Sequence, residues 1–414
     1  MTERKSGTQR VTRLPLTTTP AKPADPEDPT TRLAEGRVLA PTDVRQIIGL
    51  TKELRGDHLR SAVKRHSAVA PGATKTDLDA LLPDDLSGRA IKAHLDECVV
   101  GQERAKMFLS ILFSMHSRRF RRTDTTRQPA VDHNPVAPNA LLLGPTGVGK
   151  THSIRSAADY LKLPCVIVDS TSLVPSGTRE GRGFDDVLNE LVKRARDIAV
   201  ANGLPPDVAP TLASRGIVLF EGFDRLRAQE GAAHQQSHAI TQRALAMFLE
   251  GSYQPALGSN SGGILFIASG VFNGIDAVDI RLKRPRYLSR LRIDPISADV
   301  ITYGFLPEIV ARLPLLIQFK PLAQSDFLAI LGNERVDPTR LFKEHFRAMG
   351  KSLELTDQAR ELVAEQALSL NIGALGLQQV LFPILARLAY DFETSADTVC
   401  VLDERQVREL LGRQ

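Results

Sequence analysis

A glycine-rich loop in the first half of the chain limits the possible folds more than any other stretch. Residues 144–151 read Gly-Pro-Thr-Gly-Val-Gly-Lys-Thr, which is the spacing of a phosphate-binding loop. The apolar run 140–143 before the loop predicts a buried strand, and the apolar positions over 152–161 recur with helical periodicity. Backbone N–H groups of such a loop, together with a helix N-terminus, favour a bound phosphate. The sequence therefore predicts a nucleotide site rather than a glycine-rich loop without a ligand.

The loop residues have separate expected roles. Lys150 can reach the terminal phosphates of a nucleotide, and the Thr151 hydroxyl can bind Mg²⁺. We therefore expect ATP and Mg²⁺ as cofactors, with ATP or ADP as the small-molecule partner. The other residues expected to contact the nucleotide are Gly144, Pro145, Thr146, Gly147, Val148, Gly149 and His152.

Composition restricts the class of protein. Of the 414 residues, 42% are hydrophobic and 24% are charged, which is typical of a globular protein in water. No apolar run approaches the roughly 18 residues of a membrane span, and the N-terminal stretch lacks the apolar core of a secretory signal. Three scattered cysteines (Cys98, Cys165 and Cys400) match neither a metal knuckle nor a disulfide framework. We therefore expect a cytoplasmic protein without a membrane partner.

The pattern of elements predicts four regions. Residues 1–34 are rich in Pro and Thr and are expected to be a disordered tail, and residues 35–80 a small helical segment of unknown role. Over 81–320, apolar strands at 165–169, 215–221 and 263–269 alternate with helices such as 184–202. This alternation predicts an α/β fold with a parallel sheet covered by helices on both faces. Residues 321–414 predict a mainly helical small domain with two short strands, 352–355 and 398–402, that could pair.

Six further stretches share one register with the phosphate loop. In this order and spacing, the chain resembles the AAA+ unfoldase subunits of the Clp protease, the ClpX family, over roughly residues 85–404. The resemblance implies an AAA+ large domain, a helical small domain and a ring, usually a hexamer, that acts on protein clients with ATP between its subunits. The stretches that carry it are 95–102, 215–220, 244–251, 264–267, 304–314 and 373–377.

The resemblance also implies roles for single residues. Val99 and Val100 would pack on the adenine base, although ordinary packing at a helix start explains them equally well from the sequence alone. Arg312 would reach the γ-phosphate of a neighbouring subunit as an arginine finger; the alternative is a surface cation. Glu221 would help to hold Mg²⁺. Ser269 would contact the γ-phosphate as a sensor, unless it is only a serine at a strand end.

The chain departs from the family at the residue that activates water. The family has Asp-Glu after the strand that ends near residue 220, whereas this chain has Glu221 and Gly222. Glycine carries no base, and loss of a general base commonly slows a reaction by about 10²–10⁴-fold. Asp224 lies two residues further on and could partly substitute, but the family already has this Asp beside its Glu. We therefore expect slow hydrolysis or none.

Three other departures concern domain coupling, substrate grip and docking. Leu375 stands where the family has a sensor arginine, and the expected axial-channel loop, 175–183, has no aromatic residue to push a polypeptide. Neither the Ile-Gly-Phe docking motif nor the N-terminal four-cysteine zinc module of the family is found, so docking onto a peptidase is not expected. The basic run 281–292 stands in the docking region; it predicts a solvated loop more readily than a polyanion site.

Two classes of function remain open. The first is a ClpX-like ATPase that remodels proteins with weakened hydrolysis. The second is a scaffold or regulatory subunit that binds nucleotide without turnover, which the residues at 178, 222 and 375 favour. An ATPase associated with nucleic acid is less favoured, and a monomeric P-loop kinase conflicts with the C-terminal domain and Arg312. The nine histidines show no metal-binding spacing.

Overall fold

The computed structural model describes residues 78–121, 138–173, 182–227, 232–250, 263–275, 297–395 and 397–411. Several predicted features lie wholly or almost wholly outside these ranges: the N-terminal tail, most of the 35–80 segment, the channel loop 175–183 and the basic run 281–292. Within the described ranges, no helix combines the length and the apolar character that a membrane span requires.

A parallel sheet organises the nucleotide-binding region. Five strands of the described chain pair in the order β2-β3-β4-β1-β5, and every pair is parallel. All five strands therefore end at one edge, where β1 leads into the phosphate loop. The bounds are Ala140–Leu143 (β1), Cys165–Asp169 (β2), Ile217–Glu221 (β3), Leu265–Gly270 (β4) and Leu315–Gln318 (β5).

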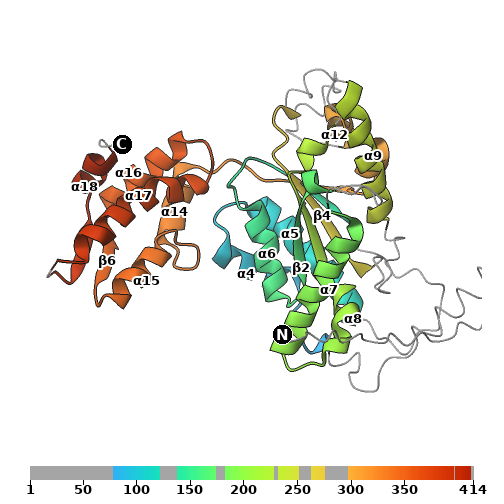
Figure 1. The fold of residues 1–414 in the computed structure, drawn as a ribbon, viewed down its shortest axis with the longest axis horizontal. Helices are drawn as coiled ribbons and strands as arrows, with labels where there is room; N and C mark the ends of the chain where they lie inside the picture. The colour runs from blue at the N-terminus through green and yellow to red at the C-terminus, as the bar shows by residue number, and fades with distance from the viewer. Residues whose placement is uncertain are drawn as a thin grey trace, which may run out of the picture. The chain divides into compact units, whose positions relative to one another are not determined.

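Helices lie on both sides of the sheet (Figure 1). Alternate strand residues enter two separate cores, one on each face. On β3, Ile217 and Leu219 pack with α4 (Gly88–Cys98), α5 (Glu103–Arg121) and α6 (Lys150–Tyr160). Val218 and Phe220 pack with α7 (Phe184–Ala201), α8 (Ala209–Ala213) and α9 (Ala232–Leu249). Burial on both faces explains why the strands read as continuous apolar runs. The predicted α/β fold with a covered parallel sheet is confirmed.

The fifth strand was not predicted. β5 follows α12 (Ser297–Tyr303) and α13 (Pro307–Val310), and it pairs with β1 at the edge of the sheet. The sequence pattern is too weak to predict it, because only four residues separate Pro314 from Phe319 and most of them are half-exposed. Pairing with a central strand decides its conformation, a tertiary effect that local propensity does not contain.

The C-terminal residues form helices around a two-stranded sheet. The predicted strands are present as β6 (Ser352–Leu355) and β7 (Val399–Leu402), which pair in parallel. The helices are α14 (Gln324–Gly332), α15 (Arg340–Ala348), α16 (Asp357–Ser369), α17 (Leu375–Phe392) and α18 (Glu404–Leu411), of which α18 was not predicted. The four-region division of the chain at 34, 80 and 320 stays a prediction.

A buried histidine links α5 to the start of β3. The His116 side chain is fully buried, and its Nε2 donates to the Arg215 carbonyl at 2.8 Å. Arg215 in turn pairs with Asp79 at 2.8 Å. Burial lowers the pKa of His116 to about 4, and the nearby positive charge of Arg119 acts in the same direction. The imidazole is therefore neutral near pH 7.

We expect this histidine to make the fold sensitive to acid. The unfolded chain takes up the proton near its ordinary pKa of about 6.5, whereas the folded chain takes it up only near pH 4. Stability therefore falls as pH drops through this window, by about 2 kcal/mol between pH 7 and pH 5 from His116 alone. Urea unfolding at both pH values measures this loss. His116→Gln keeps an N–H donor but cannot titrate, so its free energy of unfolding should fall by about 2 kcal/mol less between pH 7 and pH 5 than that of the unmodified protein. An equal fall in both proteins contradicts the prediction.

Candidate nucleotide-binding site

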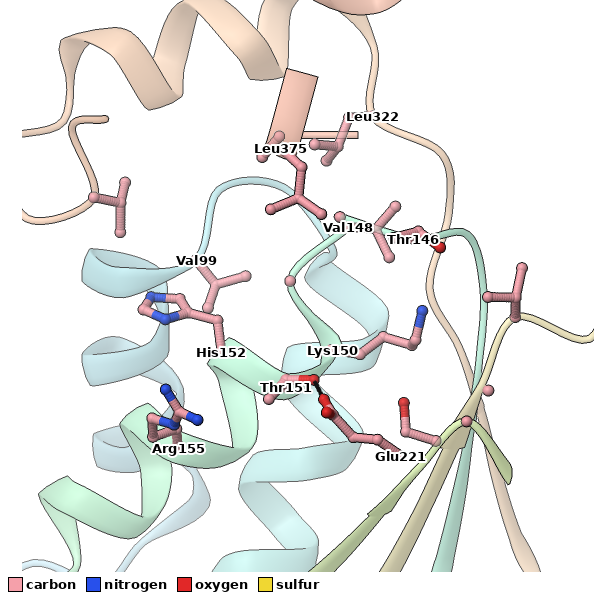
Figure 2. Close-up of a pocket in the computed structure, with 18 of the residues that line it drawn as sticks. Val99, Thr146, Val148, Lys150, Thr151, His152, Arg155, Glu221, Leu322 and Leu375 are labelled. Carbon is pink, nitrogen blue, oxygen red and sulfur yellow. Dashed lines mark hydrogen bonds between the residues drawn. The ribbon is translucent and has the colours of Figure 1, made fainter. Parts of the chain in front are cut away.

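A cavity of about 1040 Å³ opens where β2, β3 and β4 end and the phosphate loop begins (Figure 2). Most of the site residues predicted from the sequence line this cavity. They are Val99, Val100, Thr146, Gly147, Val148, Gly149, Lys150, Thr151, His152, Glu221 and Ser269. Gly144 and Pro145 act one step behind it, through carbonyl groups that Lys150 contacts. Arg312 is absent from the lining.

The phosphate loop requires glycine at defined positions. Gly144 has φ +147°, and a Cβ there would come within 2.5 Å of the Phe319 carbonyl oxygen. Gly149 has φ +95° and directly precedes α6. This helix begins at Lys150, two residues earlier than predicted, so Lys150 and Thr151 lie in its first turn. The first N–H groups of a helix have no partner within the helix, which makes this end suited to an anion.

Lys150 is held inside the loop. Its ammonium donates to the carbonyls of Gly144 and Pro145, each at 2.6 Å, and its side chain is buried. Burial lowers the pKa of Lys150 to about 8, while the negative charges of Asp224 and Glu221 act in the opposite direction. A cation with little solvent around it interacts strongly with phosphate oxygens.

Thr151 and Glu221 meet at the bottom of the cavity. The Thr151 hydroxyl donates to the Glu221 carboxylate, a contact drawn in Figure 2. This brings together the two residues expected to hold Mg²⁺. Hydroxyl and carboxylate oxygens fit this ion, which commonly uses one or two protein ligands together with phosphate and water. No group of three or more His, Cys, Asp or Glu side chains suited to a metal occurs within the described part of the chain.

The opposite end of the cavity is apolar. Val99 follows α4 directly, is buried and lines the cavity, so packing and contact with a flat base are compatible roles. The His152 ring nitrogen lies 3.0 Å from the Cys98 carbonyl oxygen and fixes this side of the wall. Apolar residues of the C-terminal region complete it: Ile330 on α14, Leu375 on α17, Leu322 just before α14 and Val336 between α14 and α15.

Two predicted departures occur at defined places in the site. Gly222 has φ +63° directly after β3, so the chain turns there without a side chain. Leu375 is the first residue of α17, and it lines the cavity with an alkyl group that cannot pair with a phosphate (Figure 2). The neighbouring Ala374 N–H donates to the Gly147 carbonyl at 2.9 Å. Contact between α17 and the phosphate loop is therefore made by the main chain.

Arg312 lies just after α13 and away from the cavity of its own chain. Its guanidinium forms an ion pair with the Glu250 carboxylate and donates to the Glu308 carbonyl at 2.7 Å. Ser269, by contrast, is buried on β4 beside Leu142 and lines the cavity. The fold of one chain thus brings Ser269 to the predicted site and leaves Arg312 outside it.

Three charged residues that line the cavity were not considered in the sequence analysis: Arg155, Asp169 and Arg225. Asp224, expected there only as a partial substitute for the missing base, lines the cavity as well. Two signals could have identified some of them. Asp169 ends β2, and the carboxyl ends of parallel strands meet at one edge. Arg155 lies four residues after Thr151 and therefore on the same helix face.

We expect ATP affinity to fall above pH 8. The pKa of Lys150 is about 8 in the structure, and the negative charge of a triphosphate raises it, so binding takes up a proton at higher pH. Affinity should weaken up to about tenfold from pH 8 to pH 9. Calorimetric titration with ATP measures this change. Lys150→Arg, which stays charged, should show little of it; a matching decline in that variant would show that Lys150 is not the titrating group.

Comparison with known proteins agrees with this geometry. The model of the ATPase family associated with various cellular activities (AAA) matches residues 140–294. The ATP-dependent Clp protease ATP-binding subunit ClpX 3 of Methylococcus capsulatus is 30% identical over 358 residues, which cover 76% of this chain and 78% of that protein. ClpX 2 of Wolinella succinogenes is 28% identical over 334 residues, covering 75% of this chain and 79% of the relative. ClpX of Treponema denticola is 27% identical over 354 residues, which cover 78% of this chain and 80% of that protein. This chain therefore belongs to the ClpX family of AAA ATPases.

Proposed function

We propose that this protein is an ATP-dependent protein-remodelling subunit of the ClpX type whose hydrolysis step is slow. ATP binding is supported by the phosphate loop, the buried Lys150 and the apolar wall around Val99. The observation that carries the second half is the residue after β3: Gly222 lines the cavity where the family has its water-activating glutamate. The relatives are named as ATP-binding subunits of an ATP-dependent protease, which supports the same class of function.

We assign the Mg²⁺ ligands to Thr151 and Glu221, which already contact each other. The ion would neutralise charge on the β- and γ-phosphates. Lys150 binds the same phosphates from the loop side. Ser269, near the end of β4, lines the cavity and can contact the γ-phosphate. The chain therefore retains the residues that are needed to bind ATP and Mg²⁺.

Water activation is the step that the chain supports poorly. A missing general base costs about 10²–10⁴-fold in rate. Restoring the family residue also meets resistance, because the left-handed φ of +63° at Gly222 disfavours a residue with a side chain. We therefore propose slow turnover rather than the rate of an ordinary AAA+ motor.

Assembly into a homo-oligomeric ring is supported by Arg312. A guanidinium that does not line its own nucleotide cavity can act on phosphate if a neighbouring subunit supplies that phosphate. The partner it now has, Glu250, is half-exposed, so the pair can exchange at low cost. Ring size and protein clients are open parts of the proposal. Docking on a peptidase is not included, because the Ile-Gly-Phe motif is not found in 281–292.

The proposed location is the cytoplasm, where thiols stay reduced. Cys98, Cys165 and Cys400 are unpaired, and burial raises the pKa of Cys165 to about 12. A thiol in that state is inert rather than redox-active.

The second candidate is a scaffold that binds ATP and regulates without turnover. Leu375 favours it, because an alkyl group at the start of α17 cannot bind the γ-phosphate and so cannot distinguish ATP from ADP. Gly222 favours it as well. The intact phosphate loop does not discriminate between the two candidates.

Phosphate release by the purified protein separates them. We expect ATP turnover at least about 100-fold below that of an ordinary AAA+ ATPase, and none in Lys150→Ala, which removes the ammonium that holds the phosphates. Tight ATP binding with no phosphate release would leave only the scaffold. The mass of the protein in ATP and in ADP, measured in parallel, tests the ring.

Arg312→Ala tests the finger separately. We expect unchanged ATP affinity and a loss of turnover of about 10³-fold or more, because the guanidinium acts only on the transition state in the neighbouring subunit. Glu250→Ala is the matched control: it removes the intrachain partner of Arg312 and should leave turnover intact. Equal turnover in Arg312→Ala and the unmodified protein would refute the finger.

A further inference from the structure

The chain reverses direction directly after Gly222. The left-handed conformation of this glycine starts a short 3₁₀ turn, Phe223–Leu226, that is closed by a 3.0 Å bond from the Arg225 N–H to the Gly222 carbonyl. Asp224 is carried on this turn. It lines the nucleotide cavity, although it lies three residues after the end of β3. The turn therefore places a carboxylate at the wall that Gly222 leaves without one.

Asp224 is held in place from the next strand. One of its carboxylate oxygens accepts from the Val271 N–H, just after β4, at 3.1 Å. Gly270 makes this approach possible, because a Cβ there would come within 2.6 Å of that oxygen and within 2.9 Å of the Asp224 nitrogen. The carboxylate is thus fixed by a hydrogen bond from the residue that follows β4, and both it and Ser269 line the cavity.

The charge of Asp224 acts on the phosphate-binding lysine. Among the negative groups that raise the pKa of Lys150 against the effect of burial, Asp224 has the largest influence, ahead of Glu221. Asp224 and Lys150 both line the nucleotide cavity, so the carboxylate and the ammonium belong to one site. This is the site where Lys150 is expected to bind the terminal phosphates.

The other carboxylates of the described cavity wall are engaged elsewhere. Glu221 accepts from the Thr151 hydroxyl, as its proposed metal role requires. Asp169 accepts from the Thr171 N–H at 2.9 Å and from the Thr171 hydroxyl at 2.7 Å, at the end of the edge strand β2. Asp224 is thus the best-placed acid of this wall to act on water.

We propose that Asp224 accepts the proton of the attacking water in this chain, the role for which Gly222 has no side chain. This inference rests on the proposed ATPase function. In the step, the water oxygen forms a bond to the γ-phosphorus, and the bond from that phosphorus to the bridging oxygen breaks. The electron pair leaves with ADP, and the water proton passes to the Asp224 carboxylate, so ATP and water give ADP and phosphate. A base carried by a turn instead of the residue after β3 also explains a slow reaction.

Asp224→Asn tests this role with little change of shape. The amide oxygen can still accept from the Val271 N–H, but an amide is not a base. We expect turnover at saturating ATP to fall about 100-fold or more, with the Kd for ATP unchanged or tighter, since a negative charge near the phosphates is removed. Asp207→Asn, on an exposed residue outside the cavity, should leave both unchanged.

Two double variants complete the test. Gly222→Glu combined with Asp224→Asn returns an acid at the family position, and it should raise turnover at least tenfold over Asp224→Asn. Gly222→Gln combined with Asp224→Asn matches it in size and carries no acid, so it should not. Both double variants bear the same strain at position 222 and the same substitution at 224, so their difference stays informative even where the fold is weakened.

The outcomes separate this inference from the function on which it rests. Turnover in Asp224→Asn equal to that of the unmodified protein overturns the role of Asp224 and leaves the ATPase in place. ATP binding without any turnover in the unmodified protein also overturns it and supports the scaffold. Failure to bind ATP overturns the proposed function itself.

Discussion

Parallel pairing of β1 with β4, and of β4 with β3, is the constraint on which the site depends. The register aligns Leu142 with Ser269 and Phe220 with Ala268, so the strands end together. Every polar group that follows a strand is thereby delivered to one edge. The two apolar cores on the faces of the sheet hold this register, because a slip by one residue would exchange their side chains.

The chemistry at this edge is a balance between burial and charge. Burial lowers the pKa of Lys150 to about 8, and the charges of two carboxylates, Asp224 and Glu221, oppose that effect. The same carboxylates divide into one that contacts Thr151 and one that is fixed by Val271. A pocket with a buried cation and oxygen donors at its floor suits a triphosphate with Mg²⁺.

Glycine has two different structural roles in this pocket. At Gly144 and Gly149 it permits the loop to wrap an anion, which is shared with phosphate loops in general. At Gly222 it permits the left-handed turn after β3, and at Gly270 it leaves room for Asp224 beside the end of β4. Membership of the ClpX family therefore coexists with a glycine, Gly222, directly after β3.

Much of this arrangement follows from the sequence alone. The loop 144–151 and the apolar runs of β1 to β4 determine the α/β class and the position of Lys150 and Thr151, because spacing and periodicity are local properties. The strand β5 could not be predicted, because its conformation comes from pairing with β1. Only the tertiary structure decided that Asp224 lines the same cavity as Lys150 while Arg312 pairs with Glu250. The spacing of residues in the sequence does not reveal where a turn directs a side chain. The Asp224 carboxylate is fixed by a hydrogen bond from the Val271 N–H, which forms only after β3 and β4 have paired.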